Sequence, residues 1–215
     1  MTAVALILPG GGYREHAPHE ADPVAIWFRE LGFDAKVLRY PLTRHPGPLD
    51  AVRERVAALR ASGATRVLLI GFSAGGHAAG LAALQSSGLS EQVDGVVLGY
   101  PVVSFVERPH IASEQALLGR GRPESTRREV SLEALVTPMS PPFFLFHSLD
   151  DEKVPATHSL ELSRALAAVG VEHELHLYSG GGHGGGLDHN SGAWRAPCRD
   201  WLVRSRLMPT SETSS

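Results

Sequence analysis

The chain has 215 residues, of which 43% are hydrophobic and 20% charged, a composition typical of one globular domain that excludes wholesale disorder. Lys and Arg number 20 against 23 Asp and Glu, so the net charge is −3 and no basic excess is left for binding a nucleic acid. The one cysteine, Cys198, can form neither a disulfide within the chain nor a thiolate cluster for zinc.

Short apolar runs alternate with helical segments along the chain, which is the pattern of a parallel sheet covered by helices. We expect strands near residues 3–8, 34–40, 66–72, 93–100, 142–147 and 171–178. We expect helices near residues 22–31, 49–61, 74–86, 155–169 and 193–207. In the first helix, Asp22 is predicted to be the N-cap, Pro23 to lie in the first turn and Gly32 to follow the last turn. The third strand has no polar face, so we place it at the centre of the sheet.

Residues 102–141 separate the fourth and fifth strands and have little sheet character. A connection of this length in a compact domain is usually a binding loop or covers a site, and we call these residues the cover segment. We expect one domain over residues 1–208 that includes the cover segment, followed by a flexible tail over residues 209–215. The longest apolar run, at 4–8, is too short to span a bilayer and no signal peptide is recognisable, so we expect a cytoplasmic protein.

Residues 71–75 read Gly-Phe-Ser-Ala-Gly and match the pattern G-x-S-x-G. They lie where an apolar strand ends and a helix begins, as this pattern requires, because a sharp turn there raises the serine hydroxyl above the sheet edge. The glycines are needed because a Cβ at either position would crowd the turn. We predict that Ser73 is a nucleophile; the alternative is an incidental serine in a strand-to-helix turn.

A serine hydroxyl needs a base, and the base needs an acid that orients it. On this kind of fold the order along the chain is Ser, Asp or Glu, His, each on a loop after a strand. His183 follows the sixth strand within a run of glycines, so we predict that it is the base rather than a solvated residue of a flexible connector. Asp150 and Asp151 both follow the fifth strand, and residue type does not separate the acid from a residue that caps the loop.

Glycines also follow the first strand, at positions 10–12. Backbone amides at such a loop can approach a developing oxyanion closely, so we predict that Gly11, Gly12 and Ala74 donate to it. The alternatives are a plain tight turn and a dinucleotide-binding loop. The second fails because Glu15 occupies the place of the third glycine and no P-loop lysine is present.

Three residues beside these segments are predicted to contact substrate: Tyr13, Phe72 and His77. We expect His77 to be packed and hydrogen bonded rather than to be a second base. His16, His19 and Glu20 either touch substrate or anchor the glycine loop, and anchoring is favoured for Glu20.

We expect no metal and no cofactor. His173 and His176 point to opposite faces of a strand and cannot chelate one ion. Asp188 and His189 could join His183 around a metal, but the sequence shows no second pair of ligands.

Several segments spread over most of the chain match one family: Pro9-Gly10-Gly11-Gly12-Tyr13, His19-Glu20, Leu38-Arg39-Tyr40, Gly71-Phe72-Ser73-Ala74-Gly75-Gly76-His77, Asp151-x-x-Val154-Pro155 and Gly182-His183-Gly184. They resemble the small α/β-hydrolase esterases that include acetylxylan esterases and related carbohydrate esterases. The resemblance implies an α/β-hydrolase fold with a mainly parallel sheet of about six strands flanked by helices. It also implies that the acid stands two residues before a Val-Pro pair, which favours Asp151 over Asp150.

Two departures from the family accompany this resemblance. The first two strands of the usual fold are missing from the pattern, which leaves a sheet edge that a second subunit could cover, so a homo-oligomer stays open. The run of glycines around His183 is longer than in the family, and this weakens any expectation that the loop is rigid.

The sequence therefore predicts a serine esterase that hydrolyses short acyl esters, above all acetyl esters, of a sugar or xylo-oligosaccharide. The only partner expected is this small-molecule ester, with neither nucleic acid nor membrane. Polar residues of the cover segment suit a hydroxyl-rich ligand: Arg108, His110, Arg120 and Arg122. A peptidase or lactonase with the same triad is an alternative, because fold and triad do not fix the substrate. A catalytically silent binding module is another.

Overall fold

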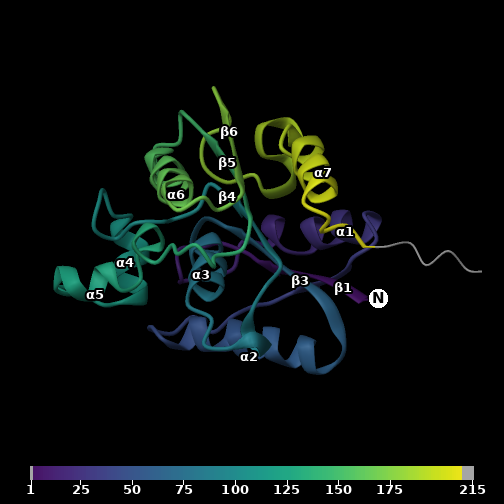
Figure 1. Ribbon diagram of the computed structural model, residues 1–215. Helices are drawn as coiled ribbons and strands as arrows, with labels where there is room; N and C mark the ends of the chain where they lie inside the picture. The colour runs from purple at the N-terminus through teal and green to yellow at the C-terminus, as the bar shows by residue number, and fades with distance from the viewer. Residues whose placement is uncertain (1, 210–215) are drawn as a thin grey trace, which may run out of the picture.

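A six-stranded parallel sheet forms the centre of the molecule, as a computed structural model describes it over residues 2–209 (Figure 1). The strand order is β2-β1-β3-β4-β5-β6, and every neighbouring pair is parallel. The strands are β1 Thr2–Leu8, β2 Asp34–Val37, β3 Ala64–Phe72, β4 Gly95–Gly99, β5 Phe143–Ser148 and β6 His173–Tyr178. The chain changes direction across the sheet between β1 and β3. Ligands of such sheets bind outside the carboxyl ends of the strands at this switch point.

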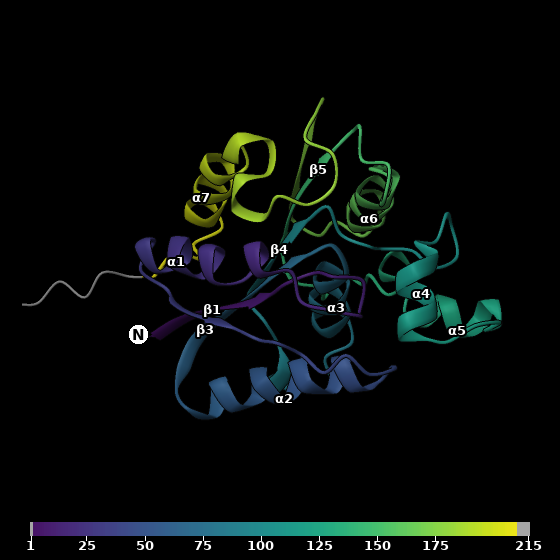
Figure 2. The ribbon, with the colours of Figure 1, turned by 180° about the vertical axis from the view of Figure 1, so that it is seen from behind.

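Helices cover both faces of the sheet (Figures 1 and 2). On one face, α1 Asp22–Glu30 and α7 Arg195–Arg204 close an aromatic-rich core; on the other lie α2 Gly47–Ala61, α3 Ser73–Leu84 and α6 Thr157–Ala168. β3 is buried on both faces from Val67 onward, as its unbroken apolar run predicts. Within residues 2–209, no helix has the length and apolarity needed to cross a membrane.

The cover segment contains α4 Ile111–Leu117, α5 Glu124–Arg128 and a 3-10 turn at Leu132–Ala134. It contains no strand, as expected, and packs beside α3 and α6 (Figure 1). Two buried histidines fasten it. His158 of α6 accepts a hydrogen bond from the amide of Val103 at Nδ1 (3.0 Å), and His77 of α3 donates from Nε2 to the carbonyl of Val130 (2.7 Å). The cover segment is thus bound to the same helix that begins at Ser73.

The sheet and helices confirm the predicted fold, and no antiparallel strand pair occurs among residues 2–209. The prediction that Asp22 caps α1 is wrong, because Asp22 is the first helical residue and a 3-10 turn at Pro18–Glu20 leads directly into the helix. Gly32 follows the helix end at φ +93°, as predicted. β2 ends at Val37, earlier than predicted. The chain leaves the sheet there, and the Tyr40 hydroxyl donates to the carbonyl of Pro9 (2.8 Å). Of the predicted tail, residues 210–215 lie outside the described part of the chain.

Candidate active site

The turn between β3 and α3 places Ser73 in a left-handed conformation, with φ +51°. A side chain at Gly71 would collide with the backbone of Gly75, and one at Gly75 would collide with the carbonyl of Leu8. The glycines are therefore required because backbone passes within contact distance of both positions. The strained turn directs the Ser73 side chain to the carboxyl edge of the sheet, at the positive end of the α3 dipole.

A continuous chain of hydrogen bonds joins Ser73, His183 and Asp151. Ser73 Oγ lies 2.9 Å from His183 Nε2, and His183 Nδ1 lies 2.7 Å from Asp151 Oδ2. The three residues follow β3, β6 and β5 respectively, so the parallel sheet brings their loops to one edge. With the proton on Nδ1, His183 can accept the Ser73 proton at Nε2, and the Asp151 carboxylate holds that tautomer.

The two neighbouring aspartates have different environments. Asp151 is 5% exposed and points at His183. Asp150 is exposed, and its Oδ1 accepts a hydrogen bond from the amide of Gly182 (2.9 Å). The structure therefore brings Asp151 to the histidine, while Asp150 caps the loop that carries it.

Asp151 accepts more hydrogen bonds than the one from His183. Its Oδ1 accepts the amides of Lys153 and Val154, both at 2.9 Å, and its Oδ2 also lies 3.2 Å from His147 Nε2. Burial alone would raise the pKa of Asp151, but the hydrogen bonds from His147, His183 and Val154 outweigh it and hold that pKa well below its usual value. Asp151 is consequently a carboxylate at any pH near neutrality. Sequence reasoning did not identify His147 as its partner.

The loop that carries His183 is held by bonds to other elements. Ser148 Oγ donates to the carbonyl of Gly180 (2.8 Å), His189 Nδ1 donates to that of Gly184 (2.6 Å), and the Gly186 amide donates to the Tyr100 hydroxyl (2.8 Å). Five glycines of this loop adopt positive φ: Gly181, Gly182, Gly184, Gly185 and Gly186. The glycines permit a path that other residues would resist, and the long-range bonds select one conformation.

The glycine loop after β1 is anchored by Glu20, which is 3% exposed. Glu20 Oε2 accepts the amide of Gly10 (2.7 Å), and Oε1 accepts the Tyr100 hydroxyl (2.7 Å). No hydrogen bond among residues 2–209 is donated by the amide of Gly11 or Gly12. These two amides and that of Ala74, in the first turn of α3, are thus without the partners that secondary structure would supply.

A cavity of about 430 Å³ opens at Ser73 and His183. Gly11 and Gly12 form part of its wall. Its other lining side chains are mostly polar or charged: Glu15, His19, Glu20, His110 and Lys153. Sequence reasoning missed Glu15 and Lys153, although their places beside the glycine loop and two residues after Asp151 were a usable signal.

Tyr13, Phe72 and His77, predicted to contact substrate, do not line this cavity. The Tyr13 hydroxyl and His77 Nδ1 are 2.6 Å apart in the core on the α3 side. Phe72 is fully buried on the opposite face of the sheet, against Tyr100 and Trp194. Burial lowers the pKa of His77 to about 4, so its imidazole is neutral at physiological pH, as a packed residue should be.

Of the four polar cover-segment residues predicted to suit substrate, only His110 lines the cavity. Arg122 Nε donates to the carbonyl of Leu118 (2.8 Å), and Arg120 is exposed at the surface. Arg108 contributes its carbonyl to His158 Nε2 (3.1 Å). The cover segment reaches the cavity through the residue that precedes α4.

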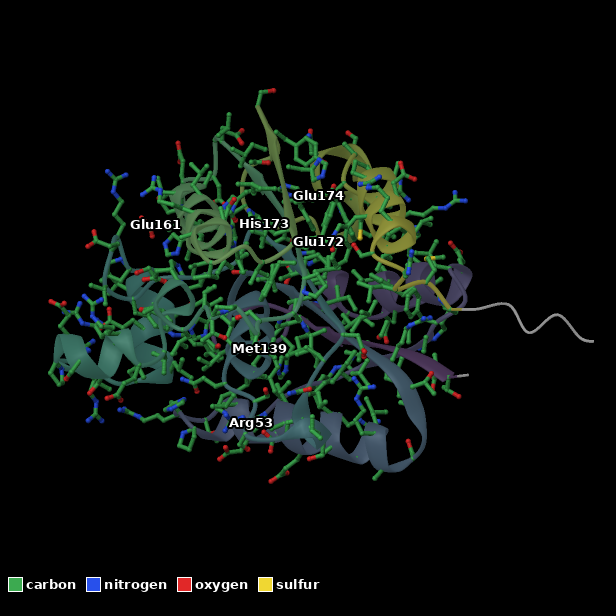
Figure 3. All side chains as sticks on the ribbon, viewed as in Figure 1. Arg53, Met139, Glu161, Glu172, His173 and Glu174 are labelled. Atoms are coloured by element: carbon green, nitrogen blue, oxygen red, sulfur yellow. The ribbon has the colours of Figure 1, made fainter. Side chains whose placement is uncertain are left out.

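No group of three or more His, Cys, Asp or Glu side chains suited to a metal ion occurs among residues 2–209. His173, the first residue of β6, stands between Glu172 and Glu174 in the chain (Figure 3), and its Nε2 lies 2.9 Å from Ser163 Oγ. His176 pairs with Glu174, and both ring nitrogens of His189 have protein partners.

Known proteins share this architecture. Residues 49–206 match the Prolyl oligopeptidase family, Peptidase_S9. The acetyl ester-xyloside bifunctional hydrolase of Caldicellulosiruptor lactoaceticus is 32% identical, with a TM-score of 0.91 over 97% of this chain and 85% of that one. A sugar hydrolase from Lactococcus lactis is 29% identical, with a TM-score of 0.80 over 95% of this chain and 89% of that one.

A curated relative, Endo-1,4-beta-xylanase B of Butyrivibrio fibrisolvens, is 28% identical over 201 residues. The alignment covers 83% of this chain but 32% of the relative, so the chain spans about a third of that protein's length. The predicted resemblance is confirmed by these matches. The chain belongs to the prolyl oligopeptidase family and has the α/β-hydrolase fold of the esterases that it resembles.

Proposed function

We propose that the chain hydrolyses short acyl esters, above all acetyl esters of a sugar or xylo-oligosaccharide, with Ser73 as nucleophile. The observation that carries this proposal is the hydrogen-bonded chain from Ser73 Oγ through His183 to Asp151 at the mouth of a polar cavity. The similarity to an acetyl ester-xyloside hydrolase supports the choice of substrate.

The reaction begins when Ser73 Oγ attacks the ester carbonyl carbon and its proton passes to His183 Nε2, 2.9 Å away. The carbonyl oxygen becomes an oxyanion that accepts from the amides of Gly11, Gly12 and Ala74, each contributing on the order of 3 kcal/mol to transition-state stabilisation. His183 then returns the proton to the departing alcohol oxygen, which leaves an acyl group on Ser73. Water repeats the sequence and releases the acid.

Hydrolysis of p-nitrophenyl acetate by the wild type and by Ser73→Ala tests the nucleophile. We expect the variant to retain less than about a thousandth of the wild-type kcat, since removal of a triad member leaves only oxyanion and binding effects. Equal rates for both proteins would end the assignment of Ser73. A wild type without activity on any ester would instead favour a binding module.

Acyl preference and alcohol preference need separate substrates. We expect kcat/KM to fall from acetyl to butyryl to octanoyl esters of one alcohol, and acetylated xylo-oligosaccharides to be hydrolysed. The family match makes a peptidase the second candidate. A prolyl p-nitroanilide peptide, hydrolysed faster than the acetyl esters, would establish that candidate in place of the esterase.

A further inference from the structure

His110 is the cover segment's polar contribution to the cavity, and α4 fixes its position. The residue immediately precedes α4, and its carbonyl accepts the amide of Glu114 (3.1 Å). Its Nδ1 lies 2.8 Å from the hydroxyl of Ser113, a residue that is fully buried. The imidazole is therefore held at one nitrogen and lines the cavity that contains Ser73 and His183.

The hydrogen-bond partners decide which ring nitrogen carries the proton. Among residues 2–209, the Ser113 hydroxyl has His110 Nδ1 as its one partner. A buried hydroxyl needs an acceptor for its proton, so Ser113 donates and Nδ1 accepts. The ring proton then resides on Nε2. Nε2 has no hydrogen-bond acceptor among the described residues, and it is not buried. This N–H is therefore available to a molecule in the cavity.

The charge state of His110 agrees with a neutral donor. Burial lowers the pKa of His110, and the positive charges of Arg14 and Lys153, with that of His183 when it is protonated, lower it further against the opposing effect of Asp151. The imidazole is therefore neutral near pH 7 and presents one N–H. A neutral donor suits an uncharged hydroxyl or ether oxygen.

The neighbours of His110 indicate which half of the ester it meets. The carbonyl oxygen is directed to the amides of Gly11 and Gly12, whereas the alcohol oxygen must approach His183 to receive its proton. His110 lines the same cavity as His183 and as Lys153, which follows Asp151 on its loop. An acetyl group has no oxygen other than its carbonyl, so the other oxygens that His110 can meet in this cavity belong to the alcohol half.

We propose that His110 Nε2–H donates a hydrogen bond to an oxygen of the alcohol half of the ester, so that esters of hydroxylated alcohols are preferred over esters of apolar ones. This inference rests on the proposed function and assigns its alcohol specificity to one residue. An apolar alcohol leaves the N–H without an acceptor inside the cavity, which is a cost that a sugar or polyol avoids.

The test compares two acetyl esters, a monoacetylated methyl xyloside and phenyl acetate, in wild type and His110→Phe. We expect His110→Phe to lower kcat/KM for the xyloside by roughly tenfold and that for phenyl acetate by less than about twofold. His110→Gln retains an N–H donor and should recover part of the xyloside activity. Arg120→Ala, on the same segment but outside the cavity, should leave both substrates unchanged.

Equal losses on both esters would show a general structural role, and no loss on either would show that the N–H has no part in selection; each overturns the inference. Thermal unfolding of His110→Phe and His110→Gln separates misfolding from lost recognition. Failure of the proposed function has a different signature, because Ser73→Ala would then keep its activity. If the wild type cleaves phenyl acetate but not the xyloside, the same comparison with glycerol monoacetate still tests His110.

Discussion

The loops that carry Asp151 and His183, the proposed acid and the proposed base, lie side by side but are fixed in opposite ways. The acid loop, residues 149–154, turns back on its own carboxylate, because Asp151 Oδ1 accepts amides two and three residues further on. The base loop, residues 179–186, is rich in glycine and is held by side chains from other parts of the chain, such as Asp150 and Tyr100.

This difference teaches that the acid position is determined locally and the base position by tertiary contacts. A change in the acid loop should therefore act on chemistry through Asp151 itself. A change in the base loop should act through the geometry of His183. The following predictions separate these two effects, beginning with the largest.

The substitution Asp151→Asn is expected to reduce kcat by on the order of a thousandfold or more, because an amide can no longer hold the Nδ1–H tautomer of His183. Asp150→Asn is the matched control. Its Oδ1 can still accept the Gly182 amide, so we expect less than about a threefold change. Steady-state kinetics on one acetyl ester measures both, and a larger loss in Asp150→Asn would reverse the assignment of the acid.

As the pH falls, the two histidines that fasten the cover segment, His77 and His158, should lower the stability of the fold before Asp151 does. Burial lowers the pKa of His77 and of His158 to about 4, so unfolded chains bind more protons than folded ones as the pH falls below about 6.5. The contribution of these histidines to the free energy of unfolding is then fully present above that pH and is lost as the pH falls toward 4. At about pH 5, each histidine should remove about 2 kcal/mol from the free energy of unfolding.

Asp151 also makes the folded protein less stable as the pH falls, but it does so at lower pH than the two histidines. Its depressed pKa adds stability that is present above the usual carboxyl pKa and lost only as the pH falls below about 4. Urea unfolding between pH 8 and pH 5 isolates the histidines, and His158→Asn, which keeps an acceptor for Val103, should flatten that dependence by about 2 kcal/mol. An unchanged slope in this variant would contradict the assignment to His158.

The base loop can be perturbed by a single methyl group. Gly186 has φ +53°, and a Cβ there would press on the backbone of His19 and Glu20. We expect Gly186→Ala to lower kcat by about tenfold through displacement of His183, since such strain costs on the order of 1–3 kcal/mol. Gly180→Ala meets only Asp150 at 3.8 Å and should change kcat by less than about twofold. Similar kinetics for both variants would mean that the loop path is not constrained.

Much of this fold was predictable because alternating apolar runs and helical segments determine a parallel sheet whose carboxyl ends share one edge. The approach of Ser73 to His183 follows from that topology. The choice of Asp151 over Asp150 did not follow from composition, because it depends on which side chain the turn directs inward. The prediction that Phe72 contacts substrate was wrong. Phe72 is next to Ser73 in the chain, but its side chain lies on the opposite face of the sheet.

The carboxylate of Glu20 is the meeting point of three loops. Through its two oxygens it joins Gly10 to the Tyr100 hydroxyl, which in turn accepts the amide of Gly186. A single buried side chain therefore fixes the relative position of two loops, the glycine loop proposed to stabilise the oxyanion and the loop of His183 proposed to transfer the proton. Within residues 102–141, Val102 donates its amide to the carbonyl of Ser73 and Val130 accepts from His77, whereas His110 makes neither contact. Substrate range can therefore be redesigned around His110 while the spacing of the reacting groups is preserved.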